Sequence, residues 1–380
     1  MSKGIKVLRI MGSVVSGGVD VITMNYYRNI DRNKVQLDFV FDGFRETNIE
    51  KEIESTGGTV YKVEPYMNNI FKNMKQIYKI VKDNNYQIVH SHMNSLSVFP
   101  LMAAKLAGAQ IRIASNHSTA TLKEFKRSIF KYLLKPFATV FPTHLAACSR
   151  HAAIWLFGKR RTNAGKVKLI KNAIDLDNYK YSANVDKEVR KELGVSEDTF
   201  IVGHVGRFVT QKNHHFIIEV FESILEKQPN SVLLLIGDGQ LKQEIQALVT
   251  KKKLNSKVKF LGIRKDINKL MQAMDVFLFP SLYEGLGNVV TEAQAASTVS
   301  IISDKVPNEV KITEYVIEMS LKQNADAWAE KAVIFSSNYE RRDTSSDLKE
   351  QGYEIKSAAK EVVSYYQNLY TTIRKDGSNT

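Results

Sequence analysis

The stretch DVFLFPSLYEGLGNVVTEA, residues 275–293, is the most diagnostic segment of this 380-residue chain. Val276–Phe279 is a short, continuous apolar run, which is typical of a parallel strand that is buried on both faces. Pro280 and Ser281 end that strand, and a helix can begin near Gly287. A buried strand that leads into a helix is the repeating unit of α/β folds. The segment therefore predicts a parallel sheet with helices on its faces.

Two carboxylates in this segment, Glu284 and Glu292, lie eight positions apart. We expect Glu284 in the loop before the helix and Glu292 on the helix, about two turns in, so that the pair can hold two parts of one elongated ligand. The backbone N–H groups of Gly287, Asn288 and Val289 lie between them at the positive end of the helix dipole, which suits a phosphate. A favourable acid near a helix start and a solvated glutamate further on remain the plainer alternative.

The surrounding pattern, a strand followed by Pro-Ser-x-x-Glu-Gly and then Glu-Ala, resembles the E-x7-E segment of retaining, family 4 glycosyltransferases of the GT-B fold. The likeness covers most of the chain, because further motifs of the family recur in the expected order. His204 and Gly352-Tyr353 are similar to bacterial exopolysaccharide and capsule glycosyltransferases. The further motifs are Lys171-Asn-Ala-Ile-Asp175, Gly206-Arg207-x4-Lys212, Ile236-Gly-Asp-Gly-Gln240 and Leu261-Gly-Ile-Arg-Lys-Asp266.

Short apolar runs alternate with amphipathic stretches along the chain, which indicates repeated β-α units and parallel sheets. The resemblance implies a GT-B architecture of two Rossmann-like domains that face an inter-domain cleft. Residues 1–177 are then the acceptor-side domain, residues 178–353 bind the nucleotide-sugar, and a helix at 354–380 crosses back to the first domain. The polar residues 178–199 favour a linker. The expected strands are 6–10, 36–40, 59–63, 88–91, 112–115, 145–147, 201–205, 232–236, 258–261, 276–279 and 299–302.

Composition restricts the partners and the location. The formal net charge is +14, which indicates a polyanionic partner such as nucleotide phosphates or an anionic membrane surface. Nucleic acid is not expected, since no zinc-finger, helix-turn-helix or aromatic RNA-binding pattern occurs. No apolar run approaches the roughly 18 residues of a membrane span. Cys148 is the only cysteine, so no internal disulfide is possible and a cytoplasmic location is expected.

Two adjacent glycines, Gly17 and Gly18, follow the first predicted strand. Glycines at this place let the backbone approach a ligand closely and leave N–H groups free for a phosphate, so we expect them to bind the donor. The dinucleotide pattern G-x-G-x-x-G is absent, which argues against a hydride-transfer enzyme. A tight turn before a helix is the alternative interpretation.

Two histidines follow neighbouring strands of the first half, His92 after residues 88–91 and His117 after residues 112–115. The resemblance implies that His92 directs its imidazole at the donor sugar and takes part in catalysis, and His117 is a candidate for contact with the acceptor. A satisfied core histidine is the alternative for each. The sequence offers no compact third ligand for a metal, so metal-independent chemistry without a cofactor is expected.

The resemblance implies transfer of a hexose from a nucleotide-sugar, with UDP as the expected nucleotide, to a glycan acceptor that is lipid-linked. The anomeric configuration is retained. Arg207 and Lys212 neutralise the leaving diphosphate in place of a metal ion, Glu284 holds the transferred sugar, Glu292 binds the ribose, and the backbone at Ile263 contacts the base. A nucleotide-sugar epimerase of the same fold and a non-catalytic nucleotide- or sugar-binding protein are the alternatives.

Two further features bear on this assignment. After Glu292 the family usually has a Gly-x-Pro turn, whereas this chain has Ser297-Thr-Val299, which can make the turn at some cost if a positive φ is required. Residues 122–137 place apolar and basic side chains on neighbouring faces of a predicted helix. This helix either faces the core with a solvated basic side or lies on the anionic inner face of the membrane, where lipid-linked glycans grow.

Overall fold

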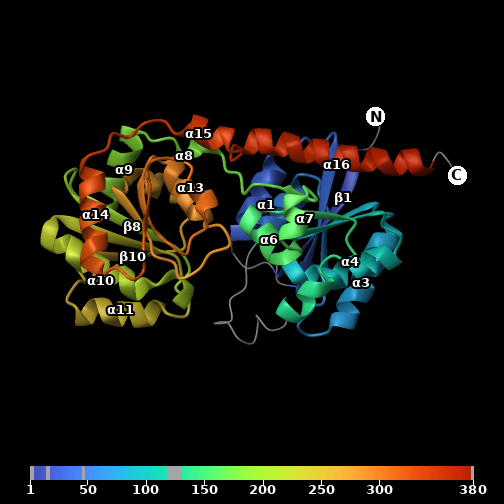
Figure 1. The fold of residues 1–380 in the computed structure, drawn as a ribbon, viewed down its shortest axis with the longest axis horizontal. Coiled ribbons are helices and arrows are strands. Elements are labelled where there is room, and N and C mark those ends of the chain that lie inside the picture. The colour runs from blue at the N-terminus through green and yellow to red at the C-terminus, as the bar shows by residue number, and fades with distance from the viewer. Residues whose placement is uncertain (1–3, 14–17, 45–47, 118–130, 378–380) are drawn as a thin grey trace. The chain divides into compact units, whose positions relative to one another are not determined.

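The computed structural model describes residues 4–13, 18–44, 48–117 and 131–377. The chain forms two compact units: unit 1 is Met1–Ile174 with Gly352–Thr380, and unit 2 is Asp175–Gln351. Each unit contains one parallel sheet with helices on its faces (Figure 1). The predicted pair of parallel-sheet α/β domains is therefore confirmed. No helix in the described ranges is both long enough and apolar enough to cross a membrane.

Unit 1 has a seven-stranded sheet in the order β3-β2-β1-β4-β5-β6-β7, and the paired strands are parallel. The order reverses between β1 and β4, which is the kind of position where open α/β sheets bind ligands. The strands are β1 Ile5–Ser13, β2 Val35–Asp42, β3 Val60–Val63, β4 Ile88–Ser91, β5 Ile111–Asn116, β6 His144–Ala147 and β7 Val167–Leu169. The helices are α1 Gly18–Asn29, α2 Asn48–Ser55, α3 Ile70–Asp83, α4 Val98–Leu106, α6 Arg150–Phe157, α7 Lys159–Asn163 and α16 Ile355–Gly377.

Unit 2 has a six-stranded sheet in the order β10-β9-β8-β11-β12-β13, again with parallel pairs. The buried strand β11 lies next to β8, where the strand order reverses. The strands are β8 Phe200–Val205, β9 Ser231–Ile236, β10 Val258–Gly262, β11 Val276–Phe279, β12 Val299–Ser303 and β13 Val316–Met319. The helices are α8 Leu176–Tyr179, α9 Ala183–Leu193, α10 His214–Lys227, α11 Lys242–Lys251, α12 Ile267–Ala273, α13 Asn288–Ala295, α14 Ala325–Ser337 and α15 Ser345–Glu350.

All eleven strands expected from the sequence are present, and two that the sequence did not indicate are added, β7 and β13. Both lie at the edge of a sheet. An edge strand is paired on one side only and stays partly exposed, so it needs no long apolar run. In β13 only Met319 is buried, and β7 has three residues. The apolar pattern that identified the central strands is therefore absent from these two.

The long C-terminal helix α16 packs on α1, β1 and β2 of unit 1, as the resemblance implies (Figure 1). The chain leaves unit 1 after Ile174 and returns to it at Gly352. A short parallel bridge closes this exit and return: the N–H of Ile174 donates to the carbonyl of Tyr353 at 2.9 Å, and the N–H of Ile355 donates to the carbonyl of Ile174 at 3.0 Å. The bridge holds α16 to the first unit.

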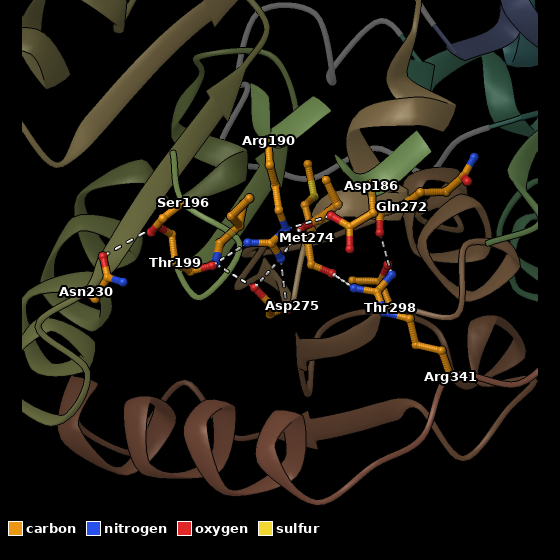
Figure 2. A network of polar contacts seen from close by, with 12 residues as sticks. Asp186, Arg190, Ser196, Thr199, Asn230, Gln272, Met274, Asp275, Thr298 and Arg341 are labelled. Carbon is orange, nitrogen blue, oxygen red and sulfur yellow. Dashed lines mark hydrogen bonds and ion pairs between the residues drawn. The ribbon is translucent and has the colours of Figure 1, made fainter. Parts of the chain in front are cut away.

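The expectation of a linker at residues 178–199 is wrong. This segment contains α9, which packs against α12 and belongs to unit 2. Its polar composition has a structural reason, because Arg190 is buried and donates to several acceptors (Figure 2). The guanidinium donates to the Asp186 carboxylate at 2.7 Å, to the Thr199 carbonyl at 2.6 Å and to the Asp275 carboxylate at 3.3 Å. A buried arginine fastens α9 to the sheet.

Asp275 extends this network to the strands. It stands directly before β11, and its carboxylate also accepts from the N–H of Ile201 in β8 at 2.7 Å. On the other side, Arg341 donates to the carbonyls of Gln272 and Met274 at 2.6 and 2.5 Å (Figure 2). The network therefore fixes the start of the strand whose far end carries Glu284.

We predict that Arg190→Ala lowers the free energy of unfolding by about 3 kcal/mol or more, because it leaves the partly buried Asp275 carboxylate without its cation. Urea unfolding measures this change. Lys187→Ala in the same helix is the matched control, since the Lys187–Glu197 pair is exposed and contributes little. Equal stability of the two variants would contradict the role assigned to Arg190.

Candidate functional site

The predicted donor-binding residues of unit 2 lie in loops that follow β8, β10 and β11, at the carboxyl edge of the sheet. Ligands of open α/β sheets bind at this edge. Backbone hydrogen bonds join the loop after β8 to its neighbours. The N–H of Gly206 donates to the carbonyl of Ile236 at 2.9 Å, and the N–H of Phe208 donates to that of Asp238 at 3.0 Å. The Gly-Arg-x4-Lys loop is thus fixed along the edge of β9.

Gly237 shows why the motif after β9 requires glycine. Its φ is +138°, and a Cβ there would lie 2.1 Å from the carbonyl oxygen of Gly206. A side chain would therefore force the two loops apart. The N–H of Gly237 in turn donates to the carbonyl of Gly262 at 2.8 Å, which connects the loop after β10. The motifs found in the sequence are consecutive parts of one continuous edge.

A second set of bonds joins the loop after β8 to the loop after β11. The N–H of Leu282 donates to the carbonyl of Gln211 at 2.8 Å, and the Gln211 side chain donates to the carbonyl of Tyr283 at 2.9 Å. Asn213 donates to the carbonyl of Pro280 at 3.3 Å. Gln211 could not be identified from the sequence, because its role depends on contacts with residues about seventy positions later. These bonds hold the two loops side by side.

Lys212 and Glu284 form an ion pair across these loops, with Nζ 2.6 Å from Oε1. Their side chains are only 14% and 9% exposed, and the ammonium also lies 4.4 Å from the centroid of the Phe279 ring. The sequence assigned the two residues to different parts of a ligand. The structure places them in direct contact, so a ligand that binds to one of the two residues also interacts electrostatically with the other.

Arg207 differs from Lys212 in its surroundings. It lies in the same loop but is exposed, and no hydrogen bond or ion pair joins its side chain to another residue of the described ranges. Ile263, in the loop after β10, is 70% exposed. A guanidinium that is free at a sheet edge can bind two oxygens of a phosphate. The loop that carries Lys212 at the carboxyl edge of unit 2 therefore also presents a guanidinium that is available to bind an anion.

Helix α13 begins at Asn288, with Gly287 as its N-cap at φ 93°. In the described ranges, the N–H groups of Gly287 and Val289 donate to no acceptor. They lie at the positive end of the helix dipole, as predicted. Glu292 is four residues after the helix start, so it lies about one turn into the helix. The expectation of two turns is wrong, because the helix starts four residues after Glu284.

Glu292 accepts a hydrogen bond from the hydroxyl of Tyr179, the last residue of α8. Burial raises the pKa of the Glu292 carboxyl to about 7, and the bond from Tyr179 opposes this rise. The carboxyl is therefore close to half protonated at neutral pH. Tyr179 had no sequence signal, since it belongs to a short helix inside the predicted linker.

Ser297 occupies the turn where the family usually has glycine. It is buried and has φ 56°, so the backbone does adopt the left-handed conformation that glycine favours. The Ser297 hydroxyl donates to the carbonyl of Arg342, and the carbonyl of Ser297 accepts from the hydroxyl of Tyr339 at 3.0 Å. These bonds offset the cost of the strained φ.

In unit 1 the structure brings the two predicted histidines together. His92 follows β4 and His117 follows β5, and since these parallel strands are paired neighbours, their ends meet. The Nδ1 of His92 lies 2.8 Å from the Nε2 of His117. Burial lowers the pKa of His92 well below its usual value and that of His117 to about 4. Both imidazoles are neutral at pH 7.

Behind His92 lies His90, whose ring is 4.2 Å away between centroids. His90 is held at both nitrogens: Nδ1 is 2.7 Å from the hydroxyl of Tyr366 in α16, and Nε2 is 2.6 Å from the hydroxyl of Ser115 in β5. Tyr366 comes 276 residues after His90, so the sequence could not indicate this contact. The C-terminal helix thus supports the histidines of the first unit.

Two predictions fall partly or wholly on residues that the structure leaves out. Gly18 starts helix α1, whereas Gly17 lies outside the described residues. Of the basic helix expected at residues 122–137, residues 122–130 lie outside them as well. Within the described ranges, no three His, Cys, Asp or Glu side chains form a group that could hold a metal ion.

The chain matches two family models and several known proteins. The model of the family "Glycosyltransferase Family 4" matches residues 16–178, and the model "Glycosyl transferases group 1" matches residues 185–354. The chain is 33% identical to the putative glycosyltransferase EpsF of Bacillus subtilis over 334 residues, which cover 86% of each chain. It is 29% identical, over 62% of this chain and 63% of the other, to a UDP-Gal:alpha-D-GlcNAc-diphosphoundecaprenol alpha-1,3-galactosyltransferase of Escherichia coli.

Solved structures show the same fold. HepE of Anabaena, solved in complex with UDP-glucose, superposes with a TM-score of 0.70 at 20% identity, and the match covers 99% of this chain and 100% of the other. WaaG, described as a glycosyltransferase involved in lipopolysaccharide biosynthesis, superposes with a TM-score of 0.68 at 14% identity, covering 94% and 98%. From these matches together, the chain belongs to glycosyltransferase family 4, with the two-domain GT-B fold, and is a glycosyltransferase.

Proposed function

We propose that the protein transfers a hexose from a UDP-sugar to a lipid-linked glycan acceptor in exopolysaccharide or capsule synthesis, with retention at the anomeric carbon. The observation that carries this proposal is the carboxyl edge of unit 2, where the exposed Arg207 guanidinium lies in the same loop as Lys212, and Lys212 pairs with Glu284 of the next loop. A leaving nucleoside diphosphate needs such cations. The E. coli relative named for a UDP-Gal donor and a diphosphoundecaprenol acceptor supports the substrate classes.

Each group in unit 2 has a proposed role. Arg207 binds the diphosphate in fork geometry, Lys212 adds a compact charge, and no metal ion is needed. Glu284 holds hydroxyls of the transferred sugar, and its position beside Lys212 brings the sugar next to the diphosphate that leaves. Because its charge is shared with Lys212, Glu284 is not assigned as a nucleophile; the leaving phosphate assists attack on the same face. Glu292 binds the ribose, and the exposed backbone at Ile263 contacts the base.

In unit 1, we assign His92 to the donor sugar and His117 to the acceptor. Both are neutral, and the bond between Nδ1 of His92 and Nε2 of His117 leaves each ring one nitrogen for a sugar hydroxyl, a donor on one ring and an acceptor on the other. The Nε2 of His92 is buried and has no hydrogen-bond partner among the described residues. A buried nitrogen of this kind is expected to find a partner when substrate binds.

Arg207→Ala and Lys212→Ala are expected to weaken binding of UDP, each by roughly tenfold or more, since a hydrogen bond to a charged group contributes about 1.5–3 kcal/mol. Isothermal calorimetry with UDP measures the effect. Lys259→Ala, in β10 away from the loops, is the matched control. If both variants bind UDP as tightly as the unchanged protein, the diphosphate is held elsewhere.

Binding of UDP-glucose is expected to release a proton near pH 7. Ribose hydroxyls that donate to Glu292 favour its charged form, so they lower a pKa that is about 7 in the free protein. The affinity should therefore rise with pH up to about 7 and then level off. Calorimetry at pH 6.5 in two buffers of different ionisation enthalpy counts the protons. Glu292→Gln should show none of this release; an unchanged count in that variant would remove Glu292 from the ribose site.

We also propose that the protein binds the anionic inner face of the membrane through the basic segment 122–137. Leu133 and Phe137, in the described part of this segment, and Val140, just after it, are exposed apolar side chains. Each Lys or Arg near an anionic surface contributes about 1 kcal/mol, and the attraction fades within about 8 Å at physiological salt. Such association is peripheral and reversible.

At low salt the protein is expected to co-sediment with anionic vesicles and not with neutral ones, and added salt should release it. Replacing Lys123, Lys126, Arg127 and Lys131 together by Gln should abolish the binding, while replacing Lys251, Lys252, Lys253 and Lys257, of which Lys251 and Lys253 are exposed, should not. Equal binding to neutral vesicles would refute the electrostatic account and would leave the glycosyltransferase assignment untouched.

A further inference from the structure

Arg9 is a buried cation of unit 1 without an anionic partner. It lies in β1 and is 2% exposed. Its Nη2 donates to the hydroxyl of Tyr366 at 3.3 Å, and its Nε has no hydrogen-bond partner within the part of the chain that the structure describes. In the ranges that the structure describes, no ion pair joins Arg9 to a carboxylate. Burying a guanidinium is costly unless an anion compensates it. An uncompensated guanidinium is therefore an indication of a ligand.

Arg9 lines a pocket whose other walls are the ends of β4 and β5 and the helix α1. His92 and His117 lie on the strand side, and Thr23 lies on the helix side. Lys171 supplies a second cation on the wall and is half-buried, with its Nζ 5.2 Å from the centroid of the Tyr353 ring. The pocket thus combines two cations with two neutral imidazoles.

The charge of these groups selects the ligand. His92 and His117 are neutral, so Arg9 and Lys171 provide the positive charge. A sugar hydroxyl carries no charge and would leave both cations uncompensated, and a carboxylate would neutralise only one. A phosphate ester has one or two charges and three or more acceptor oxygens, which matches two cations and the unpartnered Nε of Arg9. The interior has room for only one or two water-sized groups, so phosphate oxygens enter while the rest stays at the mouth.

We propose that the Arg9 pocket of unit 1 binds a phosphate group of the acceptor. The assignment rests on the proposed function only in naming the acceptor as the source of the phosphate; that the pocket binds a phosphate follows from the buried charge itself. Arg207 and Lys212 already serve the donor diphosphate, so the pocket has no donor phosphate to hold.

Binding of glucose 1-phosphate to the full chain tests the proposal. The measurement uses calorimetry in an Arg207→Ala, Lys212→Ala background, which removes the donor-side cations. Glucose 1-phosphate is expected to bind, and both Arg9→Gln and Lys171→Gln should lower its affinity at least tenfold. Lys6→Gln, which removes an exposed cation of the same strand, is the matched control and should change nothing. Lys171 is half-buried, so its variant keeps the test valid if Arg9→Gln does not fold.

Two further ligands separate the sources of the phosphate. Glucose without phosphate should not bind. Inorganic phosphate that binds while glucose 1-phosphate does not would overturn the acceptor assignment, because the pocket would then exclude an ester. Equal affinity for glucose 1-phosphate in the Lys171→Gln and Lys6→Gln variants, or no binding in the parent background, would overturn the site altogether. Failure of the unchanged protein to bind UDP would instead refute the proposed donor and would leave these results standing.

Discussion

The ion pair between Lys212 and Glu284 is the contact that organises the donor side of this protein. It joins two loops that are 72 residues apart in sequence, and its atoms are 2.6 Å apart in a setting where little of either side chain reaches water. Neither charge can lose its partner cheaply there. The pair therefore couples the residue assigned to the diphosphate with the residue assigned to the transferred sugar. A change in the position of the Lys212 ammonium therefore also changes the position of the Glu284 carboxylate.

The bonds around this pair explain why the family motifs occur as they do. Gln211 and Asn213 tie the two loops through backbone carbonyls, and Gly237 lets a third loop approach. Each motif is thus a place where one loop of the sheet edge meets its neighbour. Arg207 is left outside this set and stays exposed. Hydrogen bonds between the loops hold Lys212 and Glu284 in place, whereas the Arg207 side chain remains accessible to an anion.

Unit 1 is organised by a comparable line of buried polar groups. The hydroxyl of Tyr366 contacts both Arg9 and His90. The ring of His90 lies next to that of His92, which in turn is hydrogen-bonded to His117. Three neutral imidazoles and an uncompensated guanidinium form no stable apolar core, so stability alone does not explain them. A substrate that supplies hydrogen-bond acceptors and negative charge does. The return of the C-terminal helix to unit 1 is what brings Tyr366 into this line.

Much of the fold followed from sequence because the central strands are continuous apolar runs and the motifs mark the loops between them. The sequence did not predict the edge strands β7 and β13, which are short and have one buried residue each. The polar segment that contains Arg190 was misinterpreted as a linker, because its burial depends on Asp275 some eighty residues later. Arg9, Tyr179 and Tyr366 were missed for the same reason: each acquires its role from a partner that is distant in the chain.

The most direct test of the account is product analysis with a panel of UDP-, GDP- and ADP-hexoses and a diphosphate-linked lipid glycan as acceptor. Mass spectrometry follows the acceptor, and nucleotide release is measured in parallel. The account predicts that a UDP-hexose extends the acceptor by one hexose and that one UDP is released for each transfer. A donor that is isomerised while the acceptor stays unchanged, or a donor that binds without any turnover, would contradict it.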